Sequence, residues 1–489
     1  MIARVAGGRP ALVRMPSSGA FPLAASGACA TVALLTVVMP RAALSLVIVL
    51  LIVALWLIRP DLGVVALWTT WLLIAGARRV LDLALPVEGY DPLSIVPFAA
   101  TAAVAALELL KRRLPPRPQR IMILAALGLA IGVPAGAWNP PALTFALFAY
   151  GAGILAFGIG YAEGLRTERS TSGSRCVAAL LAPLALYGLA QYVLALPAWD
   201  EQWVREAQLT SIAVPGDIEH VRVFSALNSP ATFGSVLAVG LVAVLARDRI
   251  TPGAAIAAAL ALVALGLTYV RMAIPALAIG LIVYAAASRW RALPRVAGFA
   301  AAVVAASLAL GATTQAGGLV LERVSTLGSL SADRSANERQ TTFWQVVPEA
   351  ALSPLGHGVG TAGEPSKLAP EAAFGAAVDN GYLGLLYQLG PVGFLLVLAA
   401  MAAAVGSLIR ARAPTPGLQR ARQLDLAIVA TLFVLAVATD VFYGILGALL
   451  WFHLGHGLAL ADRSGAPPAA RRPGIRETLR SGRDAGRYD

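Results

Sequence analysis

Long apolar stretches recur along nearly the whole chain and are separated by short polar or charged segments. A membrane-spanning helix needs about 20 mostly apolar residues, and the stretches of that kind cover residues 21–39, 42–58, 61–77, 92–110, 120–137, 141–161, 176–196, 229–246, 252–269, 270–288, 295–314, 382–409, 424–441 and 444–461. The pattern predicts an all-α polytopic integral membrane protein with about 12–14 transmembrane helices.

Composition agrees with this class. Hydrophobic residues make up 58% of the chain and charged residues 13%, whereas a soluble domain carries about 25% charged residues. The two cysteines, Cys29 and Cys176, fall in or beside different predicted spans, so a disulfide framework is not expected. No signal-peptide cleavage site follows the first apolar stretch, and we interpret that stretch as a span.

The net charge of +12 is explained by topology. Most Lys and Arg residues fall in every second connection, including 111–120, 410–423 and the stretch after residue 462. The positive-inside rule then places both termini in the cytoplasm. We expect a cytoplasmic tail at 1–20 and a basic tail without fixed structure at 462–489, which would contact membrane lipids. Nucleic acid is not an expected partner.

Within the predicted transmembrane domain, residues 21–461, two external connections are long enough to carry function: a smaller loop at 197–228 and a large loop at 315–381. In the large loop, Ser335 and Glu338 have capping-box spacing. A short amphipathic helix is expected over residues 336–350, on the outer membrane surface, with Pro348 as a point where it kinks or ends. Residues 353–360, SPLGHGVG, predict a turn beyond it.

The stretch 252–287 contains a single charge, Arg271. As one helix it would be about 54 Å long, which exceeds a hydrocarbon core of about 30 Å. The chain must therefore turn back at residues 268–271, TYVR, and Arg271 is predicted at the tip of a tight external hairpin.

Three external arginines, Arg222, Arg271 and Arg339, are predicted near the outer membrane interface. Guanidinium groups bind phosphate oxygens bidentately and stay charged, and they stabilise the negative charge of a departing pyrophosphate. A lipid-linked pyrophosphate therefore suits such a cluster. The alternative is that each arginine extends to lipid headgroups.

Asp379 and Asn380 directly precede the span 382–409. A carboxylate at the membrane edge is costly unless it is solvated, paired or used. Either residue could cap the helix that begins near Tyr382. Elsewhere, His453 and His456 have i,i+3 spacing, for which packing or a hydrogen bond is favoured over metal binding because their own span offers no carboxylate. Asp440 is interpreted as an interfacial cap.

An ordered series of motifs carries a family likeness: VRVFSALNSPATFGSV at 221–236, TYVRMAIPALAIG at 268–280, SANERQTTFW at 335–344, PLGHGVG at 354–360 and VDNGYLGLLYQLGPVG at 378–393. In this order and topology the chain resembles the bacterial O-antigen ligase and polysaccharide polymerase superfamily, over roughly residues 120–460.

The resemblance implies a C-type membrane glycosyltransferase without metal or cofactor, whose donor is an undecaprenyl-pyrophosphate-linked glycan on the periplasmic side. It implies that Arg222, Arg271 and Arg339 hold the pyrophosphate, with Arg271 and Arg339 also counted as catalytic, and that Asp379 accepts the proton of the acceptor hydroxyl. Asn380, Tyr382 and Trp344 are implied as substrate-binding residues, the two aromatic ones stacking on sugars. Relatives that act as ligases have a histidine where this chain has Asp379.

The expected function is polymerisation of lipid-linked repeat units into a surface or exopolysaccharide, alongside chain-length regulator and flippase proteins. A ligase that transfers glycan to lipid A-core or another glycan or lipid acceptor is the first alternative. A transporter or flippase of lipid-linked sugars is the second, although transporters usually show inverted repeats and midplane charges.

Overall fold

The computed structural model describes residues 39–86, 89–111, 113–166, 171–206, 212–214, 217–247, 249–294, 297–298, 301, 334–368, 378–411 and 415–465. The helices are α2 (Pro40–Ile58), α3 (Pro60–Ala84), α4 (Val96–Lys111), α5 (Pro116–Ile131), α6 (Val133–Gly136), α7 (Pro140–Arg166), α8 (Ser172–Val193), α9 (Ala198–Glu206), α10 (Pro230–Leu245), α11 (Pro252–Leu267), α12 (Ala273–Ala287), α15 (Arg334–Leu352), α16 (Gly381–Arg410), α17 (Pro416–Leu435) and α18 (Gly444–Gly465). Two 3-10 helices, η1 (Pro92–Ile95) and η5 (Glu364–Leu368), complete the helical part.

Local sequence explains where many helices begin. Proline occupies a first-turn position in α2, α3, α5, α10, α11 and α17, where its missing N–H costs nothing. Ser229, Thr251 and Thr415 cap α10, α11 and α17 by accepting a backbone N–H. The sequence thus marks its own helix starts inside long apolar runs.

Among the described residues, seven helices are long and apolar enough to cross a membrane, and α10, α11 and α12 are shorter apolar helices. This agrees with the predicted all-α polytopic membrane fold. Residues 21–38 of the first predicted span and most of 295–314 lie outside the described residues, as does the tail from 466. Every other predicted span coincides with a helix, 120–137 being shared by α5 and α6.

The predicted end of one span is wrong, and the correction changes the position of Asp440. The span predicted at 424–441 is α17, which begins at Pro416 and ends at Leu435. The carbonyl of Ala436 accepts a hydrogen bond from Gly381 N, at the start of α16, so the chain leaves the helix there. Residues 436–443 form a connection, and Asp440 lies in this connection.

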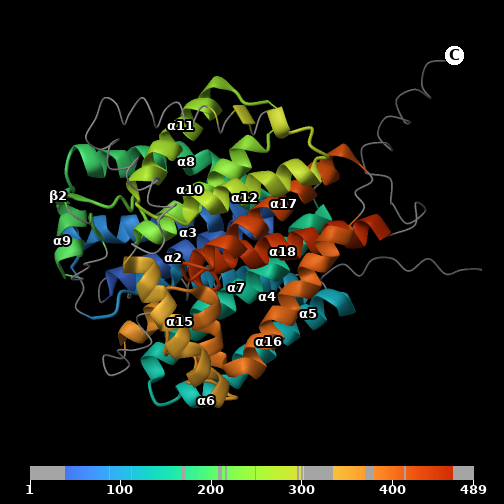
Figure 1. The fold of residues 1–489 in the computed structure, drawn as a ribbon, viewed down its shortest axis with the longest axis horizontal. Helices are drawn as coiled ribbons and strands as arrows, with labels where there is room; N and C mark the ends of the chain where they lie inside the picture. The colour runs from blue at the N-terminus through green and yellow to red at the C-terminus, as the bar shows by residue number, and fades with distance from the viewer. Residues whose placement is uncertain are drawn as a thin grey trace, which may run out of the picture.

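The bundle is built around α18 (Figure 1). In its apolar stretch 89% of the residues are buried. Its main partner is α7, and glycines bring the two backbones together. A Cβ on Gly160 would overlap the carbonyl of Phe452, and one on Gly455 would overlap the carbonyl of Phe157. Small residues at such crossings allow the close packing that holds helices together in lipid.

Polar contacts separate the two ends of the bundle. At one end Arg41 pairs with Asp82 and Asp91, and Arg79 pairs with Asp200. At the other end Arg166 pairs with Glu108, while Asp462 accepts hydrogen bonds from Tyr161 and Arg117. Each contact joins segments that the charge pattern predicts on one side of the membrane. We call the end that carries Arg41 and Asp200 the outer end, following that pattern.

The outer end carries the irregular structure. The smaller external loop contains α9 and an antiparallel pair of short strands, β1 (Ala213–Val214) and β2 (Asp217–Val221), which the sequence did not predict. In the large loop, α15 spans Arg334–Leu352, close to the predicted 336–350, and Pro348 lies inside it without ending it. Val346 of α15 is buried with Leu383 and Tyr387 of α16. This contact fixes α15 across the start of α16.

Candidate functional site at the outer end

The turn between α11 and α12 is the predicted hairpin. The chain leaves α11 after Leu267 and enters α12 at Ala273, so Arg271 lies in the turn. Tyr269 adopts a left-handed backbone conformation, with φ of 54°, and Thr268 Oγ1 accepts a hydrogen bond from Val270 N. These local features make a tight reversal that aims the turn outward, as the length argument required.

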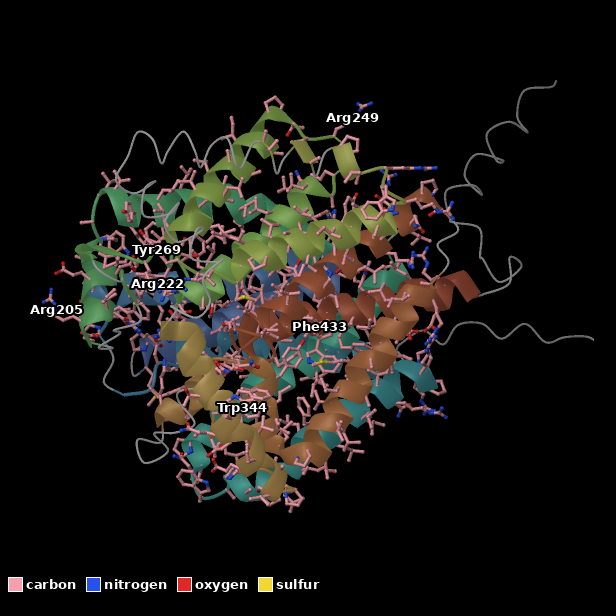
Figure 2. All side chains as sticks on the ribbon, in the orientation of Figure 1. Arg205, Arg222, Arg249, Tyr269, Trp344 and Phe433 are labelled. Carbon is pink, nitrogen blue, oxygen red and sulfur yellow. The ribbon has the colours of Figure 1, made fainter. Side chains whose placement is uncertain are left out.

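Arg222 lies against this turn. It directly follows β2, its backbone N–H donates to Ile212 O, and its guanidinium Nε donates to Thr268 O at 3.0 Å. Figure 2 shows Arg222 and Tyr269 together at the left of the bundle. Arg222 therefore contacts the turn that contains Arg271, another of the three predicted arginines.

The arginine turn and the connection 436–443 share the outer end of one helix pair. Gly280 of α12 lies against Ala427 and Thr431 of α17, and Gln423 of α17 donates to Ala287 O. Later residues of α12 thus face earlier residues of α17, and the two helices are antiparallel. The turn before α12, with Arg271, and the connection after α17, with Asp440, consequently lie at the same end.

The start of α16 meets the same connection. Gly381 N donates to Ala436 O at 2.8 Å, and Asn380 is the N-cap of α16, since its Oδ1 accepts from Tyr382 N and Leu383 N. Capping is therefore done by Asn380, one of the two possibilities that the sequence left open. Asp379 is exposed and precedes the cap.

Asp440, which the sequence suggests as an interfacial cap, has a different environment in the structure. It is half-buried, and its Oδ1 atom is buried without a hydrogen-bond partner among the described residues. Burial, followed by the nearby charges of Asp379 and Glu364, raises the pKa of Asp440 to about 8. Gly363, at φ of 72°, leaves room for this carboxyl. With that pKa the Asp440 carboxyl is mostly protonated at neutral pH, and it lies in the connection between α17 and α18 rather than capping a helix.

Two aromatic hydroxyls line this side of the site. Tyr443 lies edge-on to Tyr150 at 5.6 Å and accepts a hydrogen bond from Glu364 N. Tyr150 accepts from Gln388 Nε2. Burial, then Asp440 and Glu364, raise the pKa of Tyr443 well above its usual value, so this hydroxyl stays protonated and supplies a donor beside Asp440.

The glycine-rich turn is held by a break in α16. Gly390 has φ of 63° inside this helix, followed by Pro391, which frees the carbonyl of Gln388 to accept from Gly358 N. Val359 N donates to Gly132 O between α5 and α6. The predicted turn at 353–360 is thus confirmed, and it is anchored where two helices are interrupted. Irregular backbone at such depth requires buried partners of this kind.

The remaining predicted site residues are placed differently. Arg339 lies in α15, but its side chain is outside the described part of the chain. Trp344, also on α15, is 65% exposed (Figure 2). Tyr382 is partly buried, donates its hydroxyl to Phe433 O and lies edge-on to Phe442. Its ring therefore packs inside the bundle, while Trp344 presents an open aromatic surface.

His453 and His456 form hydrogen bonds, as the sequence favoured, but with a carboxylate that it did not identify. Asp425 of α17 accepts from both, with Oδ1 2.8 Å from His453 Nδ1 and Oδ2 2.6 Å from His456 Nδ1. The partner comes from the neighbouring helix, so inspection of one span could not find it. Over the described residues, no group of three or more His, Cys, Asp and Glu side chains is arranged to hold a metal ion.

Residues 256–398 match the family model described as O-antigen ligase. The chain carries an O-antigen ligase family domain. The matched region contains the α11–α12 turn, α15, the glycine-rich turn and the start of α16, and the match confirms the resemblance to the O-antigen ligase and polymerase superfamily. No curated protein and no solved structure is significantly similar to the chain.

The domain match indicates a multi-pass membrane protein with glycosyltransferase-like activity of the O-antigen ligase or polymerase type. Of the residues discussed above, Arg271, Asp379 and Asn380 fall inside the matched region, whereas Arg222 and Asp440 fall outside it. The geometry of the outer end therefore adds residues that the domain match alone would not select.

Proposed function

We propose that this protein polymerises undecaprenyl-pyrophosphate-linked repeat units into a surface or exopolysaccharide, on the periplasmic side of a bacterial inner membrane. The proposal is supported by the shared outer end of α12 and α17, since the arginine turn, Asp379 and Asp440 all lie at that end. Cationic side chains for a pyrophosphate and an ionised carboxylate for a hydroxyl proton are the two elements that inverting glycosyl transfer needs.

In the proposed reaction, Asp379 accepts the proton of the acceptor hydroxyl as the hydroxyl oxygen attacks the anomeric carbon of the donor. The bond between that carbon and the pyrophosphate oxygen breaks with inversion. The electron pair leaves on the lipid pyrophosphate, whose charge Arg222, Arg271 and Arg339 stabilise. Asp440 stays protonated at neutral pH, so the negative charge of the carboxyl pair rests on Asp379.

Polymerisation is preferred over ligation because of the step into α16. Ligases of the superfamily are expected to have a histidine where this chain has Asp379, followed by Asn380. A carboxylate can also act as the base, so this difference leaves the chemistry intact while it departs from the ligase pattern.

The proposal is tested by incubating purified protein with lipid-linked repeat units and separating the products by size. A ladder of lengthening glycans is expected, and Arg271→Ala, inserted at the wild-type level, should give none. Products on a lipid A-core acceptor without a ladder would indicate a ligase. Transport of the lipid-linked sugar without any new glycosidic bond would overturn the enzymatic assignment. A metal chelator should leave the ladder unchanged, and reversible inhibition would show that the mechanism uses a metal.

A further inference from the structure

A buried ion pair at the outer end contacts the residues that follow Arg222. Arg79 of α3 and Asp200 of α9 are both 0% exposed, with Nε of Arg79 2.7 Å from Oδ1 of Asp200. Removing two charges from water costs several kcal/mol per ion, and only good geometry with further hydrogen bonds compensates for that cost. A protein in which apolar residues replace a buried ion pair is often equally stable. Stability alone therefore does not explain the Arg79–Asp200 pair, and its other contacts indicate its role.

Those contacts converge on one short stretch of backbone, residues 224–228. The guanidinium of Arg79 donates to Ser225 O at 2.6 Å, to Leu227 O at 3.0 Å and to Asn228 Oδ1 at 3.1 Å. Its Cζ lies 5.1 Å from the ring centre of Phe224. An arginine that donates to two backbone carbonyls and one side-chain oxygen of the same short stretch acts as a clamp on that backbone.

Asp200 completes the clamp from the other side. Its Oδ2 accepts from Tyr187 Oη and from Gln191 Nε2, both at 2.6 Å. The side-chain oxygen of Gln191 then accepts from Ser225 N at 2.7 Å. Ser225 is held in a left-handed conformation, φ 55°, and its hydroxyl donates to Leu184 O. The strained residue is thus fixed through its N–H, carbonyl and hydroxyl.

The clamped stretch connects two functional positions. Arg222 lies just before it, and Ser229, which caps α10, lies just after it. Between the clamp and Arg222, Val223 N donates to Leu267 O at the end of α11. The path of the backbone at 224–228 therefore decides where Arg222 stands relative to the turn that carries Arg271.

We propose that Arg79 and Asp200 are positioning residues, which hold residues 224–228 so that Arg222 meets the α11–α12 turn and the two arginines form one binding site for an isoprenoid pyrophosphate. The ligand part rests on the proposed function. The positional part rests on the contacts of the Arg79–Asp200 pair alone.

The first experiment measures position without any ligand. A spin label is placed at residue 222 through Arg222→Cys, in a chain whose Cys29 and Cys176 are replaced by serine, and its mobility is compared in purified full-length protein. Asp200→Asn should increase the mobility of the label. The matched control is Asp91→Asn, which weakens the outer-end pairs of Arg41 and Arg78. Within the described part of the chain, the partners of the Asp91 side chain all lie outside residues 224–228, so this variant should leave the mobility unchanged. Equal mobility in Asp200→Asn and wild-type background would overturn the proposal.

The second experiment measures binding of farnesyl pyrophosphate to the purified protein. Arg79→Lys and Asp200→Asn, checked for a wild-type thermal transition, should weaken binding about tenfold, while Arg41→Lys should not change it. In the Arg222→Ala background the Arg79→Lys substitution should have no additional effect, because it acts through Arg222. Additive losses would contradict positioning. No binding by the wild-type protein would instead contradict the proposed function, and the spin-label result would still decide the position of Arg222.

Discussion

The hairpin formed by α17 and α18 carries two carboxyl clusters. One cluster lies between the two helices and the other lies in the connection at their outer end, and the environments of the two are opposite. Inside, Asp425 is 1% exposed and each of its oxygens faces an imidazole, from His453 and His456 of α18. At the outer end, Asp440 has a buried Oδ1 without a hydrogen-bond partner in the described part of the chain, and its charged neighbours, Asp379 and Glu364, are acidic.

The difference separates a structural carboxylate from one suited to chemistry. A buried polar group is normally satisfied, and Asp425 follows that rule, tying α17 to α18. A carboxyl that is buried, poorly satisfied and close to other acids has a perturbed pKa, and such groups concentrate at functional sites. The unfavourable environment of Asp440 is offset by the packing around it, which is how strain is retained at active sites.

The largest effect should come from the outer cluster. Asp379→Asn removes the proposed proton acceptor and should lower the rate of glycan elongation by about 10²- to 10⁴-fold, with wild-type expression and thermal transition because the cap, Asn380, is untouched. The rate is measured with purified protein and lipid-linked repeat units. Full activity in this variant would remove the base assignment.

The inner cluster should respond in stability. Asp425→Ala leaves two buried imidazoles without their acceptor, and we expect a loss of about 3 kcal/mol in the free energy of unfolding, measured as thermal or denaturant unfolding in detergent. Asp425→Asn, which keeps one acceptor oxygen and the side-chain shape, is the control and should lose less. If Asp425→Ala unfolded like the wild type while elongation stopped, the comparison between the clusters would be reversed.

The sequence accounts for much of the fold because spans, proline starts and the turn at 268–271 are local features. Hydrocarbon thickness alone places Arg271 at a turn. The partners of Asp425, Arg79 and Gln388 come from distant segments, with Asp425 and His453 28 residues apart and Arg79 and Asp200 121 apart. No local pattern encodes such pairs. The early end of α17 was also missed, since the apolar run continues past Leu435, and this hid the position of Asp440.

A smaller effect is expected from pH. The carboxyl of Asp440 stays protonated in the folded protein up to about pH 8, whereas in the unfolded chain it ionises near its ordinary pKa of about 4. The unfolded state therefore binds fewer protons over this interval, and the group makes the folded protein less stable as pH rises from about 4 to about 8. The Asp440→Asn variant has no carboxyl to titrate at this position. The difference between its melting temperature and that of the wild type should therefore increase in favour of the variant from about pH 4 to about pH 8 and stay constant at higher pH.

The same titration should appear in the reaction. Above about pH 8, ionised Asp440 places a second negative charge beside Asp379, and elongation by the wild type should fall, while Asp440→Asn should not show this alkaline decline. The pH profiles of the two proteins are compared at saturating donor. A decline of equal size in both would assign the alkaline limb to another group.

The smallest effect tests whether the two outer carboxyls sense each other. The charge of Asp379 is, after burial, the largest cause that raises the pKa of Asp440. The stability difference between Asp440→Asn and its parent changes with pH, and the midpoint of that change reports the pKa of Asp440. When the parent is Asp379→Asn, this midpoint should move to lower pH. Burial and Glu364 should still keep it above the ordinary pKa of an aspartate. Melting temperatures of the four proteins in this double-mutant cycle, measured from pH 4 to pH 9, give that midpoint. An unchanged midpoint would show that Asp379 and Asp440 titrate independently. The outer end would then hold two separate carboxyls, and the charge of Asp379 would have no part in keeping Asp440 protonated.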